Sequence, residues 1–197
     1  AAPDNEPAPV ATTNIPATTP ETPETTESPL VTFTEPESGL SFVYPDKLKL
    51  QQESGLVSLL HTVQHKNSGP CDMIEEGKIY DELTDFQMNI EIVSDAPELP
   101  YIDGTLQIKD DTYEYAYMGA EGCGNTVYHL GLAEDKTLIV IRTNIQALSG
   151  ISTLWNEEEV LKVPGVISAE ENKQIFREIL FSITLKVLQT GTLDVPG

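Results

Sequence analysis

Residues 86–93 (Phe-Gln-Met-Asn-Ile-Glu-Ile-Val) alternate apolar and polar side chains with a period of two. Successive side chains of a β-strand point to opposite faces, so the apolar residues share one face and the polar residues share the other. The pattern predicts a strand that is buried on one side and hydrated on the other, as in antiparallel sheets. Because the backbone groups of such a strand need hydrogen-bonding partners, the rest of the chain must supply a sheet.

Further short strands are predicted from Leu30 onward, separated by turns rich in Gly and Pro. They cover residues 30–34, 40–44, 48–52, 57–65, 112–118, 126–132, 138–141 and 183–187. A short helix is predicted within residues 74–84, a hairpin turn at residues 102–105, and irregular structure over residues 150–166.

One long helix is predicted near the C-terminus. Residues 168–171 (Ser-Ala-Glu-Glu) fit a capping box, in which the serine hydroxyl accepts a backbone amide and the glutamate reaches back. Apolar residues then recur at helical spacing on one face, at Ile175, Phe176, Ile179 and Leu180. The predicted fold class is α+β: a mostly antiparallel sheet of six to eight strands with this helix packed on one face.

The first 29 residues have a different composition, with seven Pro, seven Thr, five acidic residues and no Lys or Arg. Such a segment cannot bury enough apolar surface to offset the entropy lost on ordering. Residues 1–29 are therefore predicted to be a disordered stalk, residues 30–187 a single domain and residues 188–197 a C-terminal tail. The stalk is interpreted as a spacer, and a passive disordered tail is the alternative.

The net charge of the chain is -21, from 11 Lys and Arg against 32 Asp and Glu. This balance argues against a nucleic-acid partner and against an anionic membrane surface, and it leaves basic partner surfaces and divalent cations open. No apolar run reaches the roughly 18 residues of a membrane-spanning helix. The N-terminal residues lack the pattern of a signal peptide, so the chain is expected to be a mature exported product, although a truncated cytosolic chain would look the same.

The two cysteines, Cys71 and Cys123, lie in settings rich in Gly and Pro, and they are predicted to form one disulfide bond. Closing a loop of about 50 residues would stabilise the domain by about 4 kcal/mol in the chain-entropy model. A reactive thiol is the competing interpretation. It is disfavoured because neither cysteine has the basic surroundings that lower a thiol pKa.

No metal or cofactor is predicted. His61 and His65 are four residues apart on a predicted strand, hence about 13 Å apart, which is too far to share an ion. Adding His129 and the two cysteine thiols as possible ligands still does not predict a transition-metal site. Oxygen ligands for calcium were considered at Asp110-Asp111 and Asp103-Gly104, but the sequence has no spaced calcium loop. Residues 157–159, three consecutive glutamates, are expected to be solvated.

Tyr113, Tyr115 and Tyr117 alternate along one predicted strand and therefore share a face. A tyrosine stripe can form a binding surface. It can equally pack beneath a helix with its hydroxyls at the rim, and this second interpretation is favoured.

Two segments resemble PsbP-like domains and related small bacterial exported proteins. They are residues 38–46 (Ser-Gly-Leu-Ser-Phe-Val-Tyr-Pro-Asp) and residues 171–186, a helix running into a final strand. The resemblance implies an α/β/α-type sandwich and an accessory or binding role without catalysis. It covers only the two ends of the domain, so no functional residue is carried over from it.

The sequence is therefore interpreted as an extracytoplasmic bacterial protein, secreted or tethered like a lipoprotein upstream of residue 1. Its expected role is a non-catalytic binding or accessory domain with a protein or cell-wall partner. The alternative is an extracytoplasmic hydrolase with an unrecognised carboxylate site. No nucleophile elbow, metalloprotease motif or phosphate loop is present in the sequence.

Overall fold

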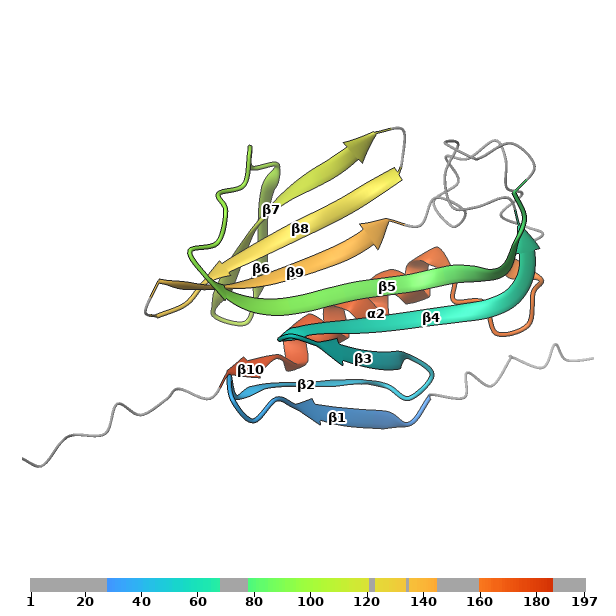
Figure 1. Cartoon of the computed structure of the whole chain (residues 1–197), viewed down its shortest axis with the longest axis horizontal. Coiled ribbons are helices and arrows are strands. Elements are labelled where there is room, and N and C mark those ends of the chain that lie inside the picture. The colour runs from blue at the N-terminus through green and yellow to red at the C-terminus, as the bar shows by residue number, and fades with distance from the viewer. Residues whose placement is uncertain (1–27, 68–77, 121–122, 134, 145–159, 186–197) are drawn as a thin grey trace, which may run out of the picture.

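The computed structural model describes residues 28–67, 78–120, 123–133, 135–144 and 160–185 (Figure 1). This part of the chain forms β-strands and one long helix, α2 (Ala169–Ser182). The strands are β1 (Leu30–Thr34), β2 (Leu40–Pro45), β3 (Lys49–Glu53), β4 (Leu56–Asn67), β5 (Tyr80–Ser94), β6 (Gly104–Ile108), β7 (Asp111–Ala120), β8 (Cys123–Gly131), β9 (Lys136–Asn144) and β10 (Thr184–Leu185). The predicted α+β class, mostly antiparallel with a C-terminal helix, is confirmed.

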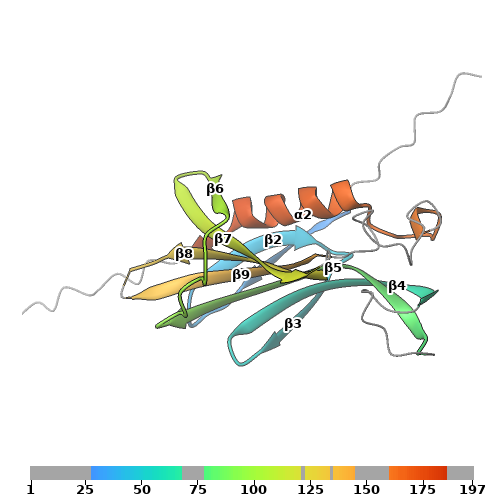
Figure 2. The same ribbon diagram turned by 90° about the horizontal axis from the view of Figure 1, so that it is seen from above.

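The strands form two sheets. The larger sheet has seven strands in the order β3-β4-β5-β9-β8-β7-β6, and the smaller has three in the order β1-β2-β10. Every described pairing between neighbouring strands is antiparallel. Figure 2 shows α2 along one side of the larger sheet, so that sheet has a helix-facing side and an opposite side.

Alternation along β5 decides which side of the sheet is apolar. Met88 and Ile90 are fully buried on the helix-facing side, in register with Leu59 and Val57 of β4. The apolar stripe of α2 fills the space above them: Ile175, Phe176, Ile179 and Leu180 are all buried. The core therefore lies between α2 and the sheet, as the two periodicities in the sequence predict.

The ends of α2 fix its position along the chain. Ser168 is the N-cap, and its hydroxyl accepts a hydrogen bond from the backbone N–H of Glu171 at 3.2 Å. The side chain of Glu171 pairs with Lys47, whereas a capping box would have it reach back to the cap. At the other end, the Ser182 hydroxyl accepts from the backbone N–H of Val43 at 2.8 Å, which joins the helix to β2 of the smaller sheet.

Two local predictions were wrong. The helix expected within residues 74–84 does not extend over residues 80–84, because β5 begins at Tyr80 and pairs there with the end of β4. Residues 74–77 lie outside the described part. Residues 102–105 do not form the expected hairpin turn, because β6 begins at Gly104. The hairpin in this region joins β6 to β7 at Lys109-Asp110, where Lys109 has a φ of 54°. Of residues 150–166, only 160–166 are described.

The burial of the helix makes a direct prediction for stability. Ile179 is 0% exposed, so Ile179→Ala leaves a cavity between α2 and the sheet and should lower the free energy of unfolding by about 2–5 kcal/mol. The matched control is Lys173→Ala on the exposed side of α2, which should change it by less than about 0.5 kcal/mol. Urea denaturation followed by circular dichroism measures both. Equal effects of the two substitutions would contradict the packing described here.

Candidate functional site

A β-bulge in β5 places a carboxylate inside the protein. His61 of β4 is paired with Phe86, and the next residue, Thr62, is paired with Thr84, so Asp85 is the extra residue of β5. A bulge of this kind turns a side chain away from the alternation of the strand. Asp85 is fully buried beside Phe86, although strict alternation would place the two on opposite sides.

Both carboxylate oxygens of Asp85 have partners. Oδ1 lies 2.6 Å from Nδ1 of His61, and Oδ2 accepts a hydrogen bond of 2.7 Å from the backbone N–H of Ile167. Ile167 is buried immediately before the N-cap of α2. Asp85 therefore joins β4 and β5 to the segment that leads into the helix, and the two partners supply the hydrogen bonds that a buried carboxylate requires.

Asn172 extends this contact to the next strand. Its side-chain amide donates to the backbone carbonyl of Asp85 at 2.6 Å, and its Oδ1 accepts a hydrogen bond from Nη2 of Arg142 at 2.9 Å. Asn172 is itself buried, on the helix side that faces the sheet. A chain of polar contacts thus runs from β4 and β5 through α2 to Arg142 on β9.

Arg142 occupies an unusual position for a cation. Its guanidinium lies over the ring of Phe176, with 5.1 Å between the guanidinium carbon and the ring centroid. Burial lowers the pKa of Arg142, and Tyr128 opposes that change through its charge and a side-chain hydrogen bond. The Nε atom is shielded from solvent and has no hydrogen-bond partner within the part of the chain that the structure describes. Among the described residues, no carboxylate forms an ion pair with Arg142.

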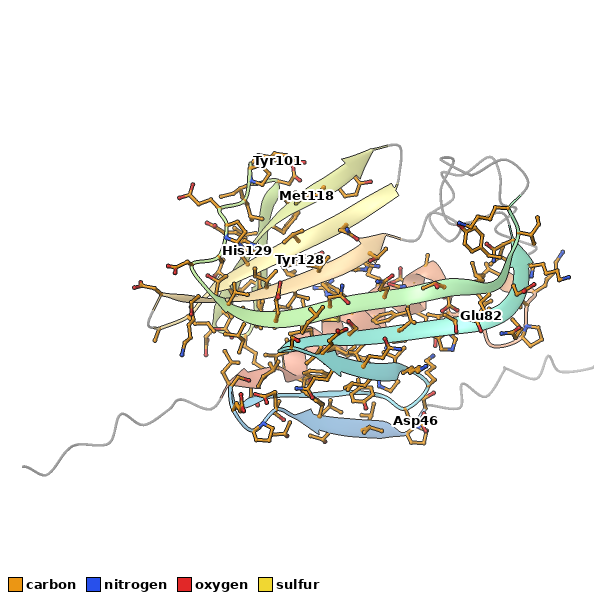
Figure 3. The ribbon with its side chains drawn as sticks, viewed as in Figure 1. Asp46, Glu82, Tyr101, Met118, Tyr128 and His129 are labelled. Carbon is orange, nitrogen blue, oxygen red and sulfur yellow. The ribbon has the colours of Figure 1, made fainter. Side chains whose placement is uncertain are left out.

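The tyrosine stripe of β7 lies on the same side of the sheet as Arg142. Tyr113 is 1% exposed, and burial, together with the charge of Asp111, raises its pKa to about 12. Tyr115 is half-buried, and its ring packs on Tyr128 of β8 with the centroids 5.6 Å apart. Tyr128 (Figure 3) in turn contacts Phe176 of α2 at 5.1 Å. The inner part of the stripe therefore packs against the helix through these rings.

Tyr117 lies at the outer end of the stripe. Its backbone N–H donates to the carboxylate of Asp103 at 2.7 Å, and its carbonyl accepts a hydrogen bond from the Tyr101 hydroxyl. The side chains of Asp103 and Tyr101, in the loop before β6, therefore supply the hydrogen bonds of the Tyr117 backbone at a point of β7 that β6 does not reach. The Tyr117 hydroxyl, in contrast, is shielded from solvent and finds no hydrogen-bond partner among the residues that the structure describes.

Sheet register brings the outer tyrosine and the arginine into one row. Tyr117 is paired with Thr126 of β8, and Thr126 is paired with Arg142 of β9. In Figure 1, α2 lies behind β4 and β5, while β7 and β8 extend to one side of it. We call this half-buried, helix-side surface the tyrosine–arginine face. It comprises Tyr115, Tyr117, Thr126, Tyr128 and Arg142.

The opposite side of the sheet carries a second polar group. His129, next to Tyr128 on β8, is paired with Glu114 of β7. Burial lowers the pKa of His129, and the charge of Glu114 opposes that change. Asn89 belongs to the same side by alternation, and its buried Oδ1 has no hydrogen-bond partner in the described ranges. Among the described residues of β7, β8 and β9, this side carries no tyrosine and no arginine.

The structure separates the residues considered as ligands or thiols. His61 and His65 both lie on β4, as predicted, and His129 belongs to β8. In the part of the chain that the structure describes, no three His, Cys, Asp or Glu side chains gather in a way that could hold a metal ion. Cys71 and residues 157–159 lie outside the described residues. Cys123 begins β8, but its side chain is not described, so the disulfide remains a prediction.

The sequence analysis did not identify three polar residues of this site, Asp85, Asn172 and Arg142, although the position of each next to an apolar pattern is unusual. Asn172 is a polar residue on the apolar stripe of the helix, three residues before Ile175. Arg142 directly follows the apolar run at residues 138–141. Asp85 immediately precedes the alternating run of β5. A polar residue that continues an apolar stripe indicates a buried polar contact, but its partner is not readable from spacing.

The contacts of Asp85 predict a large effect of its removal. Asp85→Ala leaves the Ile167 N–H and the His61 ring without their acceptor inside the core, so the free energy of unfolding should fall by about 3–5 kcal/mol. Asp81→Ala, on the exposed beginning of the same strand, is the control and should change it by less than about 0.5 kcal/mol. Urea denaturation at pH 7 compares the two. A loss below 1 kcal/mol for Asp85→Ala would show that the contact does not hold the helix.

Comparison with known proteins adds no family to these observations. No family model, no curated protein and no solved structure matches the chain. Within the described residues, no helix has the length and apolar character needed to cross a membrane. The function is therefore inferred from the residues and contacts given above.

Proposed function

We propose that this chain is a non-catalytic binding or accessory domain, exported and held at a distance from its anchor by the Pro/Thr/Glu-rich segment at residues 1–29. The tyrosine–arginine face is its binding surface. The observation that supports this proposal is the combination, on one half-buried surface, of aromatic rings with two shielded polar atoms, the Tyr117 hydroxyl and Arg142 Nε, that have no hydrogen-bond partner among the described residues.

The composition of the face suits recognition. Tyrosine and arginine are enriched in binding surfaces because each combines a large contact area with hydrogen-bonding groups. Buried polar atoms without partners are rare in folded proteins, and each one calls for an explanation. A ligand with a hydrogen-bond acceptor for Arg142 Nε and a hydrogen-bonding group for the Tyr117 hydroxyl would supply both missing hydrogen bonds.

The face is also held in place before any ligand arrives. Tyr117, Thr126 and Arg142 are fixed by the register of three adjacent strands. Arg142 is further held by the Phe176 ring and by Asn172, and Asn172 is bonded to the Asp85 backbone. Side chains that are ordered in advance lose little entropy on binding, so such a surface can bind with few contacts.

The alternative proposal, a hydrolase with a carboxylate site, has less support among the described residues. A buried His–carboxylate contact there is that of His61 and Asp85. Both oxygens of Asp85 already have partners, and the pair connects the helix to the sheet. Glycoside hydrolysis uses two carboxyl groups on either side of an accessible bond, and Asp85 is completely buried.

The exported location predicts a disulfide between Cys71 and Cys123. Thiol titration of the native, unreduced protein should find no free cysteine, and a reducing agent should lower the melting temperature by several degrees, given about 4 kcal/mol for the cross-link. The double variant Cys71→Ser/Cys123→Ser is the control, because its melting temperature should not respond to reductant. Two titratable thiols in the native protein would remove this support for export.

The location of the binding surface can be mapped with a neutral aromatic probe. Phenol titrated into the ¹⁵N-labelled protein should shift the backbone amide signals of Tyr117 and Thr126 saturably, because its ring can stack on the tyrosines and its hydroxyl can bond to the shielded groups. The amides of Ser58 and Glu91, on the opposite side of the sheet, should shift much less. Shifts confined to that opposite side would refute the assignment of the surface.

A further inference from the structure

We infer that the tyrosine–arginine face binds the carboxylate of a small organic acid, with the guanidinium of Arg142 as the anchor and the neighbouring tyrosines as contacts for the apolar part. This inference rests on the proposed function and adds the chemical class of the ligand. It is carried by the position of Arg142, by its contacts and by the row of residues across β7, β8 and β9.

The charge of Arg142 is not balanced by any described carboxylate. The chain has 32 acidic residues and only 11 basic ones, so acidic partners are plentiful. Lys47, at the more exposed end of the helix–sheet contact, does pair with one, Glu171. The described contacts of Arg142 are instead a neutral amide, an aromatic ring and a tyrosine. A charge that is partly removed from solvent and has no carboxylate partner among the described residues is costly, and a bound anion would offset that cost.

The face contains two side-chain donors that lack a described partner. Among the described residues, neither the Nε–H of Arg142 nor the hydroxyl of Tyr117 has a hydrogen-bond partner, and both atoms are shielded from solvent. Their strands flank β8, so their backbones are roughly 10 Å apart. A carboxylate has two oxygens, so it can accept hydrogen bonds from more than one side-chain donor of the face.

The surroundings favour a carboxylate over a phosphate. Arg142 is a single cation, whereas phosphate sites usually combine several donors or a helix N-terminus. A net charge of -21 also repels a dianion more strongly than a monoanion.

The rings of Tyr115 and Tyr128 pack together beside Arg142, and an apolar or aromatic ligand body can rest against them. The whole Arg142 side chain is only half-buried, so part of it is reachable from solvent.

Benzoate and benzamide form a matched pair for the test, because they have the same shape and differ in the charged group. The readout is the Nε–H signal of Arg142 in ¹H–¹⁵N spectra of the whole chain at pH 7 and constant ionic strength. Benzoate should shift this signal saturably, and benzamide should bind at least tenfold more weakly. Inorganic phosphate should also bind more weakly than benzoate.

Arg142→Gln removes the charge while keeping hydrogen-bonding groups, and it should abolish the preference for benzoate over benzamide. Arg177→Gln, on the exposed side of α2, is the matched control and should retain that preference. Because Arg142→Gln lacks the Nε–H, the backbone amide signals of Tyr117 and Thr126 report ligand binding in that variant. If Arg142→Gln does not fold, the Nε–H signal of the unsubstituted protein still decides the question.

The outcomes separate this inference from the proposed function. Equal affinity for benzoate and benzamide would overturn the carboxylate and leave the aromatic binding surface in place. Tighter binding of phosphate would overturn the ligand class. No saturable shift with benzoate would overturn the inference, and absence of shifts with phenol as well would overturn the proposed binding surface. Equal loss of the benzoate preference in Arg177→Gln would show that general charge, and not Arg142, attracts the anion.

Discussion

The buried carboxylate of Asp85 is the contact on which the arrangement of this domain depends. One of its oxygens accepts a hydrogen bond from the backbone N–H of Ile167, just before α2. The other lies within hydrogen-bonding distance of the imidazole of His61 on the neighbouring strand. A helix that packs on a sheet through apolar side chains alone can slide, because dispersion and burial are not directional. A hydrogen bond to a fixed backbone atom is directional, so Asp85 determines where along the sheet the helix begins.

The position of α2 along the sheet also determines the contacts of the proposed binding surface. Because α2 begins where it does, Asn172 meets Arg142 and Phe176 lies beneath the guanidinium. Phe176 also contacts Tyr128, which packs on Tyr115. The tyrosine–arginine face is therefore the edge of the same interface that holds the helix. A binding surface of this kind is stabilised by the core behind it.

Much of the fold was readable from local pattern, and the site was not. The alternation in residues 86–93 and the stripe at Ile175, Phe176, Ile179 and Leu180 each identify a buried face. The short helix expected within residues 74–84 was wrong where β5 extends over residues 80–84, because pairing with the end of β4 overrides weak local preference. The tyrosine stripe was found, but its neighbour across the sheet was not, since Tyr117 and Arg142 are 25 positions apart in the chain.

The sequence by itself determined the α+β class, the strands whose alternation is strong, the N-cap at Ser168 and the buried side of the helix. These follow from periodicity and capping, which depend on residues a few positions apart. Only the tertiary structure decided the strand order, the bulge that turns Asp85 inward and the row of Tyr117, Thr126 and Arg142. The physical reason is that register between distant strands, and one extra residue in one of them, choose which side chains meet, and no local preference encodes that choice.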